Sequence, residues 1–120
     1  MHVLFLVLNK KEQVKPVLRA LMNSGVSGAT LMQSTGMGRT LADEIPVFGG
    51  LRQALNGDTV GNTTIFSVIE DERVLETAIR RITEIVGDLE KPGTGILFTV
   101  PVDRVIGSRR KQAVGGAAQN

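Results

Sequence analysis

The sequence contains no cysteine, no tyrosine and no tryptophan, and its single histidine is His2. The lack of cysteine excludes disulfides, thiolate metal sites and cysteine nucleophiles from this chain of 120 residues. A Ser-His-Asp triad or a histidine metal cluster would need His2, which stands beside the N-terminus. We therefore expect no catalytic residues and no metal site, and we interpret His2 as a partly exposed residue of a first strand.

Aromatic residues and excess charge are also scarce. Aromatics make up 3% of the residues, and the net charge is +2. The sequence thus lacks both the basic footprint and the stacking platforms that nucleic-acid binding needs. The apolar run from Val3 to Leu8 is too short for a membrane span or a signal peptide. We expect a cytoplasmic protein with no nucleic-acid partner and no membrane insertion.

The residues that are present alternate between strand-like and helix-like patterns. His2 to Leu8 is a continuous apolar run, typical of a strand buried on both faces. Apolar residues at helical spacing and glycine caps predict two helices. These helices run from near Gln13 to Asn23 and between the capping residues Asp71 and Gly87. Three further strands are predicted at Gly28–Ser34, Thr63–Ile69 and Ile96–Val102.

This order indicates two β-α-β units joined by a long loop at Thr35–Gly61. Two such units in one sheet predict an α+β fold, the ferredoxin-like βαβ-βαβ sandwich. Its antiparallel four-stranded sheet carries two helices on one face. We expect one domain over residues 1–110 and a disordered tail over 111–120.

The predicted sheet has an apolar second face. The first strand has apolar residues at both its odd and its even positions, and the last strand has Ile96, Phe98 and Val100 along one side. Soluble monomers rarely expose such a patch, so we expect this face to be a subunit interface. The alternative is that the loop segment Ile45–Leu55 folds back over it.

Two glycine-rich segments are candidates for anion binding. They are Thr35-Gly36-Met37-Gly38-Arg39-Thr40 and Pro92-Gly93-Thr94-Gly95. Glycines let backbone N–H groups approach an anion, and arginine adds charge-assisted hydrogen bonds to phosphate. We expect the first segment not to open a helix, so it is no dinucleotide fingerprint. Each segment taken alone is better explained as a sharp structural turn or bulge.

Together these segments resemble the P-II nitrogen-regulatory family. Residues 25–39 are similar to the strand that leads into the family's mobile T-loop. Asp71-Glu72 is similar to the start of its second helix, and residues 93–106 to its B-loop and last strand. The resemblance spans roughly residues 1 to 110 and implies a divergent member.

The resemblance implies a non-enzymatic homotrimer that binds an adenine nucleotide (ADP, AMP or ATP) as effector in clefts between subunits. No cofactor is implied. The T-loop would lie at about 38–61 and the B-loop at about 91–95. The matching nucleotide-binding residues are Thr30, Gly36, Gly38, Arg39, Gly93, Thr94, Gly95 and Arg109.

The chain departs from the family pattern at charged positions. Ile96 replaces a phosphate-binding lysine, Gly107 replaces the first arginine of a C-terminal pair, and Thr40 replaces a glutamine used for magnesium and 2-oxoglutarate. No lysine lies between Lys15 and Lys91, so the residue that would bind the 2-oxo acid is missing. We therefore expect a weaker or altered nucleotide preference, with ADP or AMP favoured over Mg-ATP, or some other ligand in place of both.

The long loop is the candidate contact with a target transporter, enzyme or regulator. Its acidic-then-apolar segment gives the partner-binding residues Asp43, Glu44, Ile45, Pro46, Val47 and Phe48, together with Arg52. The alternative is that Phe48 and Leu51 pack into the chain's own core. Two other function classes stay open: an enzyme using the acidic pairs Asp43-Glu44 or Asp88-Glu90, and a structural trimer without nucleotide.

Overall fold

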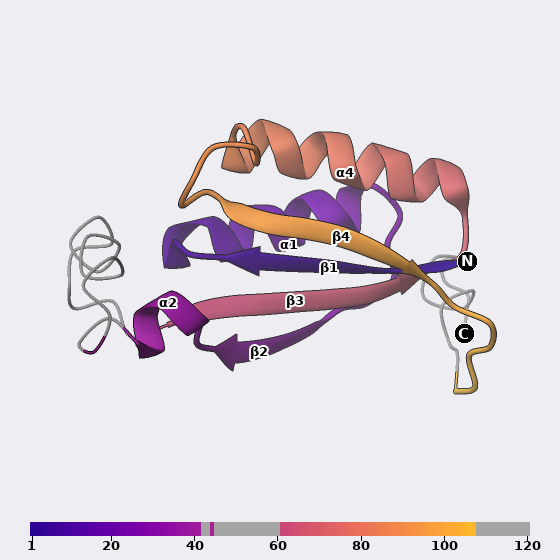
Figure 1. Ribbon diagram of the computed structural model, residues 1–120. Helices are drawn as coiled ribbons and strands as arrows, with labels where there is room; N and C mark the ends of the chain where they lie inside the picture. Colours follow the sequence, from indigo (N-terminus) through magenta and orange to yellow (C-terminus); the bar gives the residue numbers. More distant parts are fainter. Residues whose placement is uncertain (42–43, 45–60, 108–120) are drawn as a thin grey trace.

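A computed structural model describes residues 1–41, 44 and 61–107, which form one four-stranded sheet with helices on one face (Figure 1). All neighbouring strands are antiparallel, in the order β2-β3-β1-β4. The elements are β1 (His2–Leu8), η1 (Lys11–Gln13), α1 (Val14–Asn23), β2 (Thr30–Ser34), α2 (Met37–Thr40), β3 (Asn62–Ile69), α4 (Glu72–Val86) and β4 (Gly95–Pro101).

The connections form two split β-α-β units. The helix α1 links β1 to β2, and β3 lies between these two strands in the sheet. In the same way α4 links β3 to β4, with β1 between them. This topology confirms the predicted α+β class and the ferredoxin-like strand arrangement.

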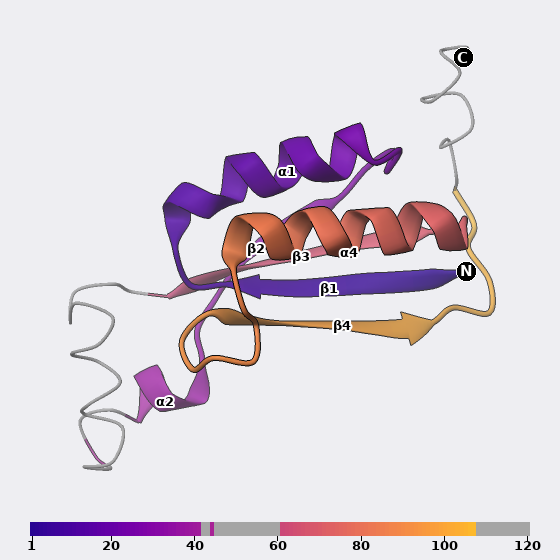
Figure 2. The ribbon, with the colours of Figure 1, turned by 90° about the horizontal axis from the view of Figure 1, so that it is seen from above.

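The core lies between the sheet and the two long helices, which run side by side over one face (Figure 2). Leu4, Leu6 and Leu8 point from β1 toward the helices and are almost fully buried. They pack in one cluster with residues from β3 and both helices, namely Ile65, Ile69, Val17, Leu21, Leu75, Ala78, Ile82 and Val86. Because successive side chains of a strand point to opposite faces, every second residue of each strand faces this core.

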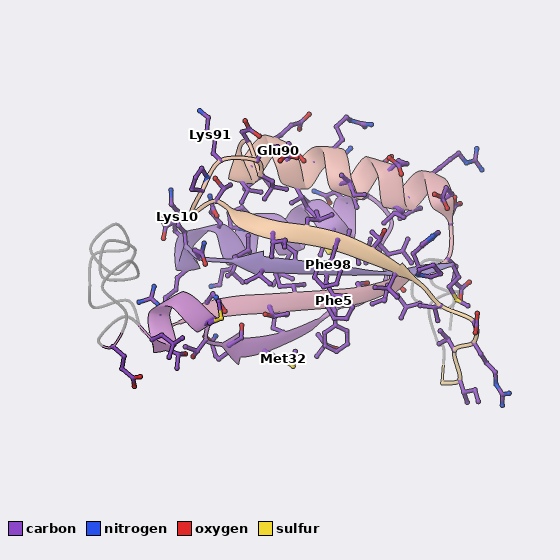
Figure 3. All side chains as sticks on the ribbon, viewed as in Figure 1. Phe5, Lys10, Met32, Glu90, Lys91 and Phe98 are labelled. Carbon is purple, nitrogen blue, oxygen red and sulfur yellow. The ribbon has the colours of Figure 1, made fainter. Side chains whose placement is uncertain are left out.

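The remaining strand residues, which alternate with the core residues, form a second sheet face that the long helices do not cover. The register places Phe5 opposite both Phe66 and Phe98 on this face. The Phe5 ring centroid lies 4.9 Å from that of Phe98 and 5.7 Å from that of Phe66. Ile96 is 55% exposed, and Phe98, Val100 and Met32 are also exposed (Figure 3). We call this surface the bare face.

The helix ends follow the predicted chemistry. Gly25 has a φ of 103°, and the N–H groups of Gly25 and Val26 donate to the carbonyls of Met22 and Leu21. This is the Schellman arrangement, and it confirms the predicted glycine cap of α1. At α4 the Asp71 carboxylate accepts from the Arg73 N–H at 2.8 Å, which confirms the predicted N-cap.

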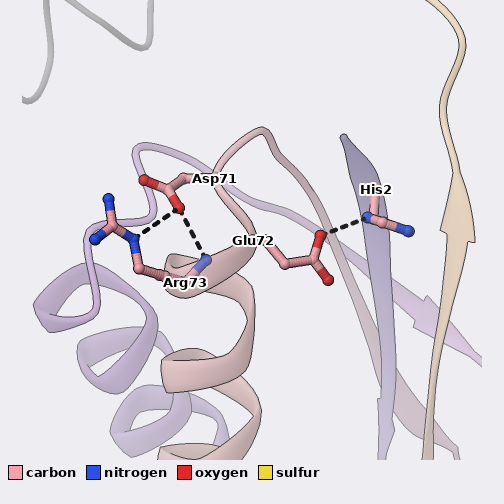
Figure 4. A network of polar contacts seen from close by, with 4 residues as sticks. All are labelled: His2, Asp71, Glu72 and Arg73. Atoms are coloured by element: carbon pink, nitrogen blue, oxygen red, sulfur yellow. Dashed lines mark hydrogen bonds and ion pairs between the residues drawn. The ribbon is translucent and has the colours of Figure 1, made fainter.

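The first strand is tied to the start of α4 through polar side chains (Figure 4). His2 Nδ1 lies 3.7 Å from Glu72 Oε1, and the His2 side chain is 28% exposed. The Arg73 guanidinium lies 3.9 Å from the Asp71 carboxylate that caps the helix. His2 is thus a partly exposed strand residue, as the sequence predicts.

Element boundaries agree with prediction to within two residues. Strand β2 begins at Thr30 rather than Gly28, whose carbonyl accepts a hydrogen bond from Ser67 Oγ. The predictions for Ile45–Leu55 and for the tail 111–120 lie outside the described residues. In the described part of the chain, no helix is long and apolar enough to cross a membrane.

Candidate functional site

The first glycine segment forms a short helix, which corrects the expectation that it opens none. Gly36 precedes α2, and Gly38 and Arg39 lie within it. The Gly36 carbonyl accepts from both the N–H and the Oγ1 of Thr40, at 3.0 and 2.8 Å. Gly36 and Gly38 have no positive φ, and methionine and arginine favour helical backbone. These glycines therefore do not serve a left-handed turn.

A polar cluster joins the two ends of the long loop, and sequence reasoning missed it. Ser34 Oγ contacts Asn62 Oδ1 and lies 2.7 Å from Thr64 Oγ1. A Cβ added to Gly61 would stand 2.5 Å from the Ser34 carbonyl oxygen. The chain enters and leaves residues 35–61 at one fixed place on the sheet because these contacts hold it. The only sequence signal was the polar start of β3.

The second glycine segment is a tight turn before β4. The Thr94 N–H donates to the Lys91 carbonyl at 3.4 Å, which closes a four-residue turn with Pro92 second and Gly93 third. Gly93 has a φ of 80°, as the third position of a type II turn requires. Asn9 Nδ2 donates to the Gly93 carbonyl at 2.9 Å and ties the turn to the end of β1.

Gly95 is required by close packing of backbone. Its φ is 136°, and an added Cβ would stand 2.5 Å from the Val7 carbonyl oxygen. Gly93 differs, because no atom lies within 4 Å of its added Cβ. Close packing in the turn is therefore enough to explain the glycine at position 95. The space beside Gly93 is open to a ligand.

The two glycine segments lie at the same end of the sheet but on opposite edges. Leu8 pairs with both Thr63 and Gly95, and Thr63 pairs with Gln33 near the end of β2. Strands β2 and β4 are separated by β3 and β1. Three strand spacings of about 4.8 Å put the two edges about 14 Å apart. One chain does not bring the two segments together around a single phosphate.

The other predicted residues are placed as follows. Thr30 begins β2, is exposed, and shares the bare face with Phe66, its register partner. Thr94 is half-buried in the turn, and Arg39 is half-buried in α2. Glu44 is exposed, and its N–H donates to the Leu41 carbonyl at 3.0 Å. The predictions for Asp43, Ile45, Pro46, Val47, Phe48, Arg52 and Arg109 fall outside the described residues.

The acidic pair near the second turn has a structural role. Asp88 Oδ1 accepts from the Glu90 N–H at 2.9 Å, and the Asp88 carbonyl accepts from the Lys91 N–H at 3.1 Å. Asp88 thus closes the turn that follows α4, as aspartate often does. Both side chains are exposed to solvent, which favours this interpretation over an acid–base pair.

The close approach at Gly95 predicts a stability effect. Gly95→Ala should lower the free energy of unfolding by about 1–3 kcal/mol, because alanine meets both the positive φ and the Val7 carbonyl. Gly28→Ala is the matched control, since Gly28 has open space and no positive φ. Thermal denaturation at equal protein concentration measures both variants. Equal melting temperatures for Gly95→Ala and the unmodified chain would contradict the account.

Comparison with known proteins identifies the family. The family model of the nitrogen regulatory protein P-II matches residues 4–112 of this chain. A search of curated proteins found no match. The matched range covers the sheet except the first two residues of β1, and it includes both long helices and both glycine segments. With these segments in family order on a ferredoxin-like sheet, the chain belongs to the P-II family of nitrogen regulatory signalling proteins.

Proposed function

We propose that this P-II family protein is a homotrimer that binds an adenine nucleotide between neighbouring subunits and regulates a partner protein through its T-loop. The nucleotide is an effector, and the chain performs no catalysis. The proposed nucleotide contacts are Thr30, Gly36, Gly38, Arg39, Gly93, Thr94, Gly95 and Arg109. The proposed partner contacts lie in the loop, at residues 43–48 and Arg52.

The placement of the two glycine segments carries this proposal. They share one end of the sheet but lie on edges about 14 Å apart within one chain. A single phosphate group does not span that distance, so a phosphate held by both segments would take one segment from each of two chains. Packing of bare faces against one another would supply the second chain, because both edges flank that face. The apolar surface and the ligand site then have a common explanation.

Burial of the bare face would supply the driving force for assembly. Phe5 and Phe98 stack at its centre, and Ile96, Val100 and Met32 surround them with exposed apolar surface. Each such side chain contributes roughly 1.5–3 kcal/mol when fully removed from water. Toward the glycine segments the same face becomes polar at Asn62 and Thr64. These two positions of β3 alternate with the buried positions of the strand, so they belong to the bare face.

The residue after the second turn should alter nucleotide preference. Ile96 stands where the family resemblance implies a phosphate-binding lysine, and its exposed side chain gives a phosphate no charged partner. A hydrogen bond to a charged group is worth about 1.5–3 kcal/mol, so its loss weakens binding of the terminal phosphate most. This supports ADP or AMP as the preferred effector over Mg-ATP.

A structural trimer without nucleotide is the second candidate. The isoleucine at position 96 and the glycine at position 107 favour it, because both remove charge from the proposed phosphate site. The open space beside Gly93 and the presence of Arg39 at the loop root favour nucleotide binding instead. Titration with nucleotides distinguishes the two candidates.

Calorimetric titration with ATP, ADP, AMP and cyclic di-AMP, with and without Mg²⁺, tests nucleotide binding directly. We expect ADP or AMP to bind more tightly than Mg-ATP. Arg39→Ala should weaken binding about tenfold or more, because it removes a charge-assisted contact to phosphate, and it should weaken binding more than Arg110→Ala. Arg73→Ala is the control, since Arg73 lies in the first turn of α4 at the opposite end of the sheet.

Failure of every nucleotide to bind would leave the structural trimer as the better account. A larger loss for Arg110→Ala than for Arg39→Ala would contradict the site assignment. Steady hydrolysis of a nucleotide that depends on Asp43 or Glu44 would instead establish an enzyme.

A charge on the bare face should prevent assembly. Phe98→Glu would place a carboxylate in the apolar interface, where burial without a partner is costly, so we expect a smaller species. Met22→Glu is the control, because Met22 is 65% exposed on α1 and away from this face. Size-exclusion chromatography with light scattering gives the mass, and circular dichroism checks folding. Equal masses for folded Phe98→Glu and the unmodified chain would contradict the proposed interface.

A further inference from the structure

A groove lies between the two long helices, and none of its lining residues belongs to the proposed nucleotide or partner contacts. Residues of α1 and α4 line it, and its volume is about 520 Å³. This is within the range of pockets that hold ligands. The lining residues are Pro16, Arg19, Ala20 and Asn23 of α1 and Arg80, Arg81, Glu84 and Ile85 of α4.

The groove is basic, and its charges are not neutralised within the described chain. Three arginines and one glutamate line it. In residues 1–41, 44 and 61–107 none of these four side chains takes part in an ion pair or a side-chain hydrogen bond. Arg19 and Arg80 are exposed, and Arg81 is half-buried. Guanidinium groups in this state are available for bidentate contacts with carboxylates.

The remaining lining is apolar or small. Pro16 and Ile85 are half-buried and Ala20 is buried, whereas Arg19 and Arg80 are exposed. An apolar strip between cations matches a segment that carries both carboxylates and apolar side chains. A small inorganic anion would leave the apolar strip unused.

We propose that the α1–α4 groove docks an acidic segment of a partner protein, with its carboxylates on Arg19, Arg80 and Arg81 and an apolar side chain against Ile85. Charge complementarity selects this occupant. The helices α1 and α4 lie on the opposite side of the sheet from the bare face (Figure 1), so assembly through the bare face would leave these helices uncovered. The docking surface therefore shares no described residue with the proposed nucleotide site.

The test uses a fluorescein-labelled peptide of alternating glutamate and leucine, with a lysine–leucine peptide as its counterpart. Fluorescence anisotropy should show binding of the acidic peptide only, with affinity that falls as salt rises. Arg80→Glu combined with Arg81→Glu should weaken binding about tenfold or more. The milder pair Arg80→Gln with Arg81→Gln, which adds no repulsion, should also weaken it.

The control combines Lys10→Glu with Arg73→Glu, which changes the net charge equally at exposed positions outside the groove. It should bind the acidic peptide like the unmodified chain. Equal binding by the groove variants, or equal loss in the control, would overturn the proposal. Full competition by inorganic tripolyphosphate at equal concentration would also overturn it, in favour of a small-anion site. Nucleotide titration of the groove variants should be unchanged, which separates this result from the nucleotide proposal.

Discussion

The structure depends on the placement of β1, an apolar strand at the interior of the sheet with apolar side chains on both sides. Its even-numbered leucines are buried under α1 and α4, and this packing fixes the register of the neighbouring strands. Its odd-numbered residues, with Phe5 at the centre, form the middle of the bare face. A strand buried on one side only would alternate apolar with polar residues. The sequence of β1 is thus already that of a strand covered on both sides.

The same constraint sets the geometry of the candidate site. Leu8 ends β1 beside both Thr63 and Gly95, so the loop root and the second turn reach one end of the sheet. Because the two segments lie on opposite edges of the four-stranded sheet, the proposed phosphate site would need one segment from each of two chains. Burial of the bare face and completion of the ligand site would therefore occur together. Ligand binding and subunit contact would be energetically coupled for the same reason.

Most of the fold could be predicted from the sequence because each helix and strand has a recognisable residue pattern of its own. Helical spacing, the Gly25 cap and the Asp71 cap gave both long helices, and apolar runs gave the strands. Sequence reasoning missed the helical turn α2, whose local hydrogen bonds to the Gly36 carbonyl form although the glycines of this segment indicated a loop. It also missed the Ser34–Asn62–Thr64 cluster, because this cluster depends on the pairing of β2 with β3 and no local pattern predicts that pairing. The groove was missed because its cations come from helices far apart in sequence.

Native mass spectrometry of the full chain with ADP tests the central claim most directly, because it counts chains and nucleotides in one particle. The account predicts trimers that carry up to one ADP per chain, and no ADP on any residual monomer. Nucleotide bound to monomers at the same occupancy would contradict the account, since the site would then be complete within one chain.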